Sequence, residues 1–287
     1  MSIIKAKNLA CPLDGKNLYS VDNHLRCDAG HTYDIARQGY VHLLPVQDKR
    51  SRNPGDSKAM VIARTEFLNS GVYEPIARHL TATISTLIDH SEGMCLLDAG
   101  CGEGYYLDYI AHALEDVTDE GRFSFIGLDI SKDAIISASK RNRQISWIVG
   151  TNRQPPIEDN SVDIIICVFG FQSIEGFSRI LKSDGMIILV EPGSGHLSEL
   201  KEIIYADVKK AKANSSEYKN FSLIDRKELR FKTGALNNKQ INNLLLMTPH
   251  LFRATKEGKE SASLLDELDV SVDIVFRLLQ KKFSEKC

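Results

Sequence analysis

The pattern of apolar and polar positions predicts alternating strands and helices from about residue 93 onward. Short apolar runs end near Ala99, Asp129 and Gly170. Continuous runs of this kind are typical of parallel strands that are covered on both faces. After the first run, the stretch YYLDYIAHAL repeats apolar residues at helical spacing. Strands and helices that alternate in this way predict a doubly wound α/β sheet.

The same pattern gives the bounds of the individual elements. Helices are predicted at 57–69, 75–88, 105–114, 133–141 and about 198–213, and strands at 94–97, 123–128, 145–150, 162–170, 185–193 and 268–281. Ser131 stands where the N-cap of the fourth helix is expected. From about residue 215 the chain is polar, and no helix or strand is assigned to SSEYKNFSLIDRKELRF.

The stretch LLDAGCGEG, residues 96–104, joins the first of these strands to its helix. Gly100, Gly102 and Gly104 allow a sharp turn that presents backbone N–H groups at a helix N-terminus. Their G-x-G-x-G spacing differs from the G-x-G-x-x-G of dinucleotide sites, and Asp98 before them suits a cationic ligand. Asp129 ends the next strand, where a carboxylate can bind ribose hydroxyls. The alternative is a glycine turn in some other α/β protein.

Composition narrows the class of protein. With 287 residues, 43% of them hydrophobic, the chain can bury one large core or two unequal ones. Its net charge of -2 indicates no global basic field. No apolar run has the length of a signal peptide core or a membrane span, so we expect a cytoplasmic protein without a membrane partner. Cys95, Cys101 and Cys167 lie in or beside predicted strands and are expected to be buried free thiols.

Residues 1–45 carry two short turns with metal-ligand chemistry. Cys11 and Asp14 lie in CPLDGKNL, and Cys27 and His31 lie in CDAGHTYD. Two such turns around a hairpin are how a zinc ribbon is built, and zinc accepts a carboxylate oxygen as a ligand. Either these four side chains bind zinc, or the ribbon has lost its metal and docks on the larger domain.

We divide the chain into a zinc-ribbon-like domain at 1–45, a linker with helices at 46–92 and a larger domain at 93–287. The linker contains the basic cluster of Lys49, Arg50 and Arg52. This cluster either contacts phosphates or is a solvated charge run.

Further candidates follow later strands, because ligands of doubly wound sheets bind at the carboxyl ends of the strands. Asn152 follows the third strand, where it can supply an amide to an adenine edge or belong to a plain loop. Phe169 and Phe171 end the fourth strand, and their rings can stack on a base or fill the core. His196 opens the last predicted helix and by itself indicates no function.

The glycine stretch looks like the first motif of S-adenosylmethionine-dependent methyltransferases. Taken together, the residues resemble the bacterial 23S ribosomal RNA (guanine-N1)-methyltransferases, a family that includes macrolide-resistance enzymes. The shared stretches span nearly the whole chain: CP-x-x, GYV-x-LLPVQ-x-KRSR-x-PGDS, ARTEFL, G-x-Y, LDAGCGEGYY, GLDISK, PG-x-x-HLSELK and LL-x-MTP.

This resemblance implies a Rossmann-like class I methyltransferase sheet that binds S-adenosylmethionine, with a zinc-binding N-terminal ribbon that helps to recognise a 23S rRNA hairpin. It implies that Tyr73, Gly102, Glu103, Asp129 and His196 contact the cofactor. It also implies a homodimer.

Three departures from the family pattern are present. Asp14 replaces a cysteine, the fourth strand ends in Val-Phe-Gly-Phe instead of Tyr-Ala-Pro-Cys, and Phe252 replaces a tryptophan. Three hypotheses follow: methyl transfer to N1 of an rRNA guanine, methyl transfer to a small molecule, and RNA binding without catalysis. The altered strand end favours the second and third, whereas the basic linker opposes the second and the complete glycine-loop motif opposes the third.

Overall fold

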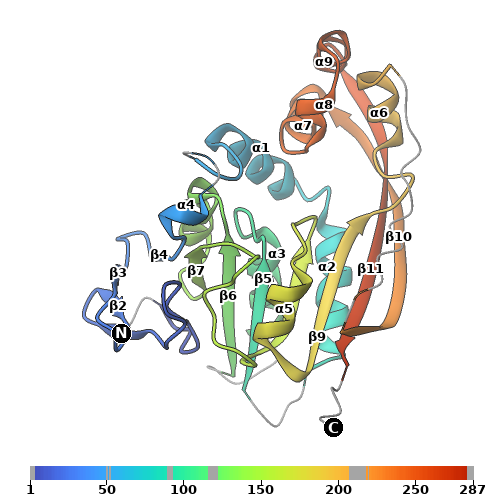
Figure 1. The fold of residues 1–287 in the computed structure, drawn as a ribbon. Helices are drawn as coiled ribbons and strands as arrows, with labels where there is room; N and C mark the ends of the chain where they lie inside the picture. Colours follow the sequence, from blue (N-terminus) through green and yellow to red (C-terminus); the bar gives the residue numbers. More distant parts are fainter. Residues whose placement is uncertain are drawn as a thin grey trace.

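The computed structural model describes residues 4–49, 51, 53–88, 93–115, 122–206, 218 and 220–282. Its main feature is an eight-stranded sheet in the order β10-β11-β9-β8-β5-β6-β7-β4 (Figure 1). The strands are β4 (Tyr40–His42), β5 (Met94–Ala99), β6 (Phe123–Asp129), β7 (Ser146–Val149), β8 (Val162–Val168), β9 (Leu181–Pro192), β10 (Phe221–Asn237) and β11 (Glu267–Lys281). The predicted α/β sheet is confirmed.

The sheet reverses its strand order at β5. Strand β6 lies on one side of β5 and β8 on the other, and both are parallel to it. In sheets of this kind, ligands bind beyond the carboxyl ends of the strands at the point of reversal, which here are the ends of β5 and β8. Only β11 and β10 run antiparallel to their neighbours among the described strands of this sheet.

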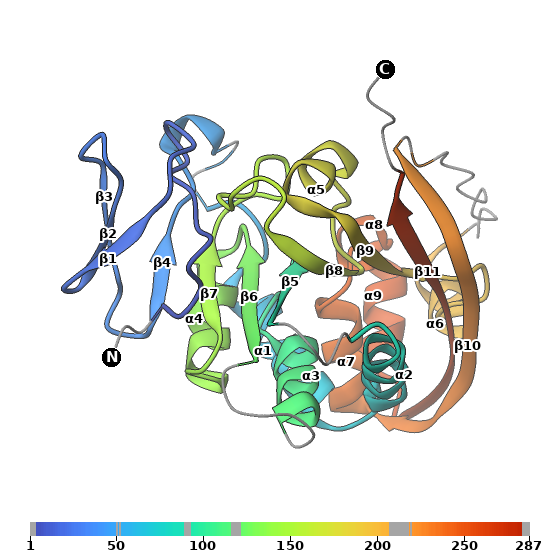
Figure 2. The same ribbon diagram turned by 90° about the horizontal axis from the view of Figure 1, so that it is seen from below.

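Helices cover the two faces of the sheet unequally. Helices α2 (Glu74–Ser85), α3 (Tyr105–Glu115) and α4 (Lys132–Arg141) pack their apolar sides on one face, together with α1 (Lys58–Asn69). The other face is covered by α5 (Ile174–Ile180) and by the N-terminal segment (Figure 2). Both faces of the sheet are therefore buried from solvent, which explains the continuous apolar runs of the central strands.

The N-terminal ribbon contains the three-stranded sheet of β1 (Tyr19–Val21), β2 (His24–Arg26) and β3 (Thr32–Asp34). Its buried residues, including Leu9 and Leu25, share one core with the large sheet. The backbone N–H of Ala10 donates to Pro156 O at 3.0 Å. Strand β4 follows in the chain and pairs in parallel with β7 at the edge of the large sheet.

The last third of the chain forms a layer that rises beyond the sheet (Figure 1). It consists of α6 (Ser198–Ile204), α7 (Asn238–Leu246), α8 (His250–Arg253), α9 (Lys256–Ser263) and the ends of β10 and β11. A short 3-10 helix, η1 (Val46–Asp48), lies in the linker.

Three expectations from the sequence are wrong here. The polar stretch that begins near 215 contains β10, a 17-residue strand. Because β10 lies at the edge of the sheet, most of its side chains are exposed and carry no alternating apolar signal. The helix expected to reach 213 ends at Ile204, where Tyr205 is extended; residues 207–217 lie outside the described part of the chain. Helices α5 and α9, of seven and eight residues, were not expected, and neither were α7 and α8.

Candidate functional site

The glycine loop lies where β5 passes into α3. Gly100, Gly102 and Gly104 all have positive φ angles, of 93°, 55° and 84°. The N–H of Gly100 donates to Leu128 O of β6 at 2.7 Å, which fixes the turn to the neighbouring strand. A Cβ on Gly104 would lie 2.6 Å from the ring of Trp147. The last glycine is therefore required by packing on Trp147 as well as by the sharp turn that the sequence predicted.

Asp98 lies beneath this loop and is 1% exposed. Neither of its carboxylate oxygens has a hydrogen-bond partner among the described residues. Burial raises the pKa of Asp98 well above its usual value, and the nearby carboxylates of Asp129 and Glu103 raise it further. A buried carboxylate without a partner is costly, so this position has the properties of a site for a cation.

Glu103 and Asp129 complete a group of acidic side chains at the loop. Glu103 is 1% exposed, and its Oε1 lies 3.5 Å from Nη2 of Arg141 on α4. Asp129 accepts hydrogen bonds from the backbone N–H of Gly102 at 2.9 Å and of Ser131 at 2.7 Å. Burial raises the pKa of both carboxyl groups. We call Asp98, residues 100–104 and Asp129 the glycine-loop edge.

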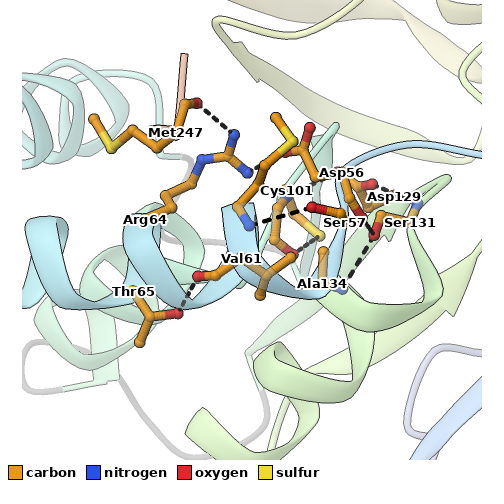
Figure 3. Close-up of polar contacts among 12 residues, drawn as sticks. Asp56, Ser57, Val61, Arg64, Thr65, Cys101, Asp129, Ser131, Ala134 and Met247 are labelled. Carbon is orange, nitrogen blue, oxygen red and sulfur yellow. Dashed lines mark hydrogen bonds and ion pairs between the residues drawn. The ribbon is translucent and has the colours of Figure 1, made fainter. Parts of the chain in front are cut away.

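The linker and α1 close over the glycine-loop edge (Figure 3). Ser131 Oγ donates to Asp56 O at 2.7 Å and, as predicted, also caps α4 by accepting from Ala134 N. Arg64 on α1 forms an ion pair with Asp56 and donates to Met247 O at 3.0 Å. Its guanidinium lies close to Gly102, since a Cβ there would be 3.5 Å from Nη1.

Tyr73 lies behind this edge at the start of α2. It is 3% exposed, and its ring meets Phe67 edge-on at a centroid distance of 5.2 Å. Its ring centroid is 6.3 Å from that of His196. In the first turn of α3, the hydroxyl of Tyr106 is buried and has no hydrogen-bond partner within the described residues.

The second group of candidates follows β8 and β9, and we call residues 168–171 and 193–197 the aromatic edge. Phe169 has a φ of 54° and is 42% exposed. Its ring stacks on that of His196 at a centroid distance of 6.0 Å and an angle of 16°. A Cβ on Gly170 would lie 3.1 Å from Ala99 O, so this loop crosses directly over the glycine loop.

Phe171 points to a different neighbour than Phe169. The guanidinium of Arg153 lies over the ring of Phe171, 5.5 Å from its centroid, and Phe171 is 59% exposed. Asn152 Nδ2 donates to Phe171 O at 2.9 Å, which ties the loop after β7 to the loop after β8. The two phenylalanines are each half-exposed platforms with separate partners, and neither fills the core.

His196 is 7% exposed, and its Nδ1 accepts a hydrogen bond from the backbone N–H of Asp273 at 3.4 Å. Burial lowers the pKa of His196 to about 3, helped by Lys201 and His250 and opposed by Asp273. The imidazole is therefore uncharged at neutral pH.

The four candidate metal ligands come together in the ribbon. Ligand atoms of Cys11, Asp14, Cys27 and His31 all lie within 4.8 Å of one another. His31 Nδ1 is 3.5 Å from Cys11 Sγ, 3.4 Å from Cys27 Sγ and 3.1 Å from Asp14 Oδ2. Zinc–ligand distances of about 2.0–2.3 Å place the corners of a tetrahedron about 3.3–3.8 Å apart, so the cluster has the size of a zinc site.

Neighbours hold these ligands in place. Asp14 Oδ1 accepts from Lys16 N at 2.9 Å, and this bond is the largest of the contacts that lower the pKa of Asp14 to about 2. Tyr33 OH lies 3.1 Å from Cys11 Sγ. The residues present thus fit a metal with mixed sulfur, nitrogen and oxygen ligands.

Three further predictions concern the cysteines, the basic cluster and membrane-spanning segments. Cys95, Cys101 and Cys167 are buried free thiols, as predicted. Within the basic cluster, Lys49 is described but Arg50 and Arg52 lie outside the described residues. Across the part of the chain that is described, no helix has the length and hydropathy of a membrane span.

Sequence reasoning did not single out Arg64, Tyr106, Arg153 or Asp273. Arg64 and Tyr106 lie inside the shared stretches ARTEFL and LDAGCGEGYY, which was the available signal. Arg153 and Asp273 are brought to the site by the fold. Arg153 contacts Phe171, 18 positions later in the chain, and Asp273 contacts Gly195, 78 positions earlier.

Comparison with known proteins shows two matching families. Residues 9–52 match the zinc-ribbon family described as "RlmA, N-terminal", and residues 96–185 match the family described as "Methyltransferase domain". A Streptomyces fradiae protein, 23S rRNA (guanine(748)-N(1))-methyltransferase, is 30% identical over 277 residues, which are 93% of this chain and 95% of the relative.

Two further relatives carry a provisional assignment to 23S rRNA (guanine-N(1)-)-methyltransferase activity. A Micromonospora griseorubida protein is 32% identical over 67% of this chain and 68% of its own length. YxjB of Bacillus subtilis is 29% identical over 92% of this chain and 94% of its own length.

Proposed function

Because this chain belongs to the family of 23S rRNA (guanine-N1)-methyltransferases, we propose that it methylates N1 of a guanine in a 23S rRNA hairpin. It is an S-adenosylmethionine-dependent methyltransferase. A bound S-adenosylmethionine would supply its methyl group as an electrophile and leave as S-adenosylhomocysteine, and the guanine would release its N1 proton to solvent.

The buried, unpartnered carboxylate of Asp98 carries this proposal. S-adenosylmethionine is cationic at its amino group and at its sulfonium. It can therefore be the positively charged partner that the Asp98 carboxylate does not have within the protein. Asp129 ends β6, where a carboxylate can bind the ribose hydroxyls of the cofactor. The backbone N–H groups of Gly102 and Ser131 hold this carboxylate in position. The residues present therefore fit the cofactor.

We assign the remaining candidates by their position. The cofactor loop consists of Gly100, Gly102, Glu103 and Gly104. Tyr73 and His196 border this loop, and Asn152 supplies an amide to the adenine of the cofactor. Phe169 and Phe171 stack on the acceptor or on a neighbouring base. Guanine must leave its stack, or come from an unpaired loop, to reach this edge.

Labelling of ribosomal RNA tests the proposal. Purified protein is incubated with methyl-labelled S-adenosylmethionine and rRNA from a strain that lacks this gene, and the label is mapped by primer extension. We expect a stop at one hairpin guanine, because a methyl group on N1 blocks base pairing. Label absent from the RNA while cofactor still binds would refute the proposal and favour a small acceptor or a binding role.

We also propose that the ribbon binds zinc through Cys11, Asp14, Cys27 and His31. Substitution of Asp14 by Cys is expected to tighten zinc binding by roughly tenfold or more, or about 1.4 kcal/mol, because thiolate is the stronger zinc ligand. Asp14→Asn should weaken binding, and Asp28→Asn, exposed in the same ribbon, is the control. Zinc affinity that is equal in all four proteins would contradict this ligand set.

We further infer a homodimer from the family resemblance, and a cytoplasmic location from the ribosomal substrate. Sedimentation velocity at several protein concentrations tests the first. A single monomeric species at all of them would refute it.

A further inference from the structure

The backbone N–H groups of the glycine loop are already used within the protein. Each of residues 100–104 donates to an acceptor: Gly100 to Leu128 O at 2.7 Å, Cys101 to the same oxygen at 3.0 Å, Gly102 to the Asp129 carboxylate at 2.9 Å, Glu103 to its own carboxyl group, and Gly104 to Cys101 O at 3.0 Å. A phosphate-binding loop keeps such N–H groups free for its anion. Residues 100–104 therefore offer no unused backbone donor to an anionic group of a ligand.

The side chains of the glycine-loop edge are predominantly acidic. Asp98 and Glu103 are each 1% exposed, and Asp129 ends the neighbouring strand β6. S-adenosylmethionine carries a carboxylate beside its amino group, in the part that derives from methionine. Three acidic side chains attract the amino group and the sulfonium but repel this carboxylate. The carboxylate therefore needs a cationic side chain as its partner at this edge.

Two arginines lie beside the acidic group. Burial raises the pKa of Glu103, and Arg141 and Arg64 oppose that rise. Arg141 is already engaged on α4, because its Nε donates to Glu103 O at 3.2 Å and its Nη2 donates to Asn69 Oδ1 at 3.0 Å. Its guanidinium also lies over the ring of Tyr105, 5.8 Å from the centroid. These contacts favour Arg64 as the partner of a ligand.

The guanidinium of Arg64 is held between the linker and the end of α7 (Figure 3). It forms an ion pair with Asp56 through Nη1, and its Nη2 donates to Met247 O at 3.0 Å. A guanidinium has five N–H groups, and these two contacts use one each. Among the described residues we find no other hydrogen-bond partner for Arg64. The planar fork therefore keeps donors for a second carboxylate.

Arg64 reaches the glycine loop at its middle glycine. A Cβ on Gly102 would lie 3.5 Å from Nη1 and 3.8 Å from Cδ of Arg64. The side chain of Arg64 is 22% exposed, so it is largely shielded from water. A charge-assisted hydrogen bond is stronger in such a place than on the open surface.

We propose that Arg64 binds the carboxylate of S-adenosylmethionine, while Asp98 faces the positive charges of the same molecule. This inference rests on the proposed function for the identity of the cofactor and is independent of the acceptor. Asp56 and Met247 O hold the guanidinium before the ligand binds, so little side-chain entropy is lost. The linker and the end of α7 thereby become part of the cofactor site.

The test compares S-adenosylmethionine with its decarboxylated form, which lacks only the carboxylate. Calorimetric titration of the full chain without RNA gives the ratio of the two dissociation constants. We expect the wild type to bind S-adenosylmethionine about 10–100-fold more tightly, as for a hydrogen bond between charged groups. In Arg64→Gln this preference should vanish or reverse, because the acidic side chains then repel the carboxylate unopposed. Arg64→Lys keeps the charge without the planar fork and should be intermediate.

Two variants serve as matched controls. Asp56→Asn breaks the ion pair from the other side and leaves the guanidinium in place, so the preference should be retained or become larger. Lys58 is an exposed cation on the same helix as Arg64. Because an exposed charge is screened by solvent, Lys58→Gln should keep the ratio within about twofold of the wild type.

Three results would overturn the proposal. Loss of the preference in Asp56→Asn as complete as in Arg64→Gln would show that the ion pair, and not direct contact with Arg64, determines the affinity. Loss in Arg141→Gln but not in Arg64→Gln would assign the carboxylate to Arg141. Equal binding of both ligands by the wild type would show that the carboxylate has no partner. If the wild type binds neither ligand, the proposed function fails and the inference fails with it.

Discussion

The glycine-loop edge and the aromatic edge lie side by side, but their side chains have different partners. At the glycine-loop edge, Asp98 is buried with no partner among the described residues. At the aromatic edge, Phe169 stacks on His196 and Phe171 on Arg153. One edge has a buried carboxyl group that needs a cationic partner when it ionises, whereas the other has half-exposed rings that already contact protein. We infer that cofactor binding depends on electrostatics and acceptor binding on stacking and shape.

The largest expected effect comes from Asp98→Asn. It removes the negative partner of a buried charge, and such losses cost about 3–5 kcal/mol, so S-adenosylmethionine affinity should fall by at least about a hundredfold. Calorimetric titration measures it, with Asp184→Asn, exposed at the far end of β9, as the control. Wild-type affinity in Asp98→Asn would show that the cation is held elsewhere.

The same variant should be more stable without cofactor. The pKa of Asp98 is higher in the folded chain than in the unfolded one, so the free protein loses stability as pH rises between these two values. Asn has no proton to lose, and Asp98→Asn should therefore raise the Tm of the cofactor-free protein at neutral pH. A lower Tm would contradict the assigned burial of this carboxyl group.

At the aromatic edge, the double change of Phe169 and Phe171 to Ala should slow the methylation of RNA without changing the affinity for the cofactor. Loss of a stacking ring costs about 1–3 kcal/mol per base, which should appear in kcat/KM for RNA while S-adenosylmethionine affinity is unchanged. Leu264→Ala, at an 80% exposed apolar position away from this edge, is the control. Wild-type methylation by the double variant would exclude these rings from the acceptor site.

The affinity for the cofactor should depend on pH, because Asp98 belongs to the glycine-loop edge. A protonated Asp98 must lose its proton to pair with a cation, so affinity should rise by up to about tenfold per pH unit while the free carboxyl group is protonated. Titrations at several pH values, repeated with Asp98→Asn, measure this slope. The variant should show no such slope, and a flat profile for the wild type would contradict the pKa direction assigned to Asp98.

Asn152 lies between the two edges, since a Cβ on Gly100 would be 3.7 Å from its Nδ2, and it should give the smallest effect. Its side chain donates to Phe171 O, and one such hydrogen bond contributes about 0.5–1.5 kcal/mol. Asn152→Ala is therefore expected to weaken both cofactor and RNA binding by a few fold. An effect on only one of them would assign Asn152 to that edge alone.

The two edges also differ in how far the sequence predicted them. Most of the glycine-loop edge is local: β5, the loop and α3 follow one another in residues 94–115, Asp129 ends the next strand, and the sequence predicted each of them. Ser131 was also identified correctly as a helix cap. Short-range patterns are sufficient here because turn, strand and helix signals all lie within a few residues of the site.

The aromatic edge depends on contacts between distant segments. Asp273 fixes the His196 turn across 78 positions, and it belongs to β11, whose outer neighbour β10 gave no strand signal. Phe169 and Phe171 are two residues apart, and their sequence does not show that they have different partners. Such pairings are set by tertiary packing, which single-sequence periodicity does not contain.

The most direct measurement is nucleoside mass spectrometry of 23S rRNA after incubation with wild-type protein and with Asp98→Asn. The account predicts 1-methylguanosine in the wild-type reaction and none above background with Asp98→Asn, because both edges must be filled for transfer. A methyl group on another nucleoside, or no methylated nucleoside although the wild type binds S-adenosylmethionine, would contradict it.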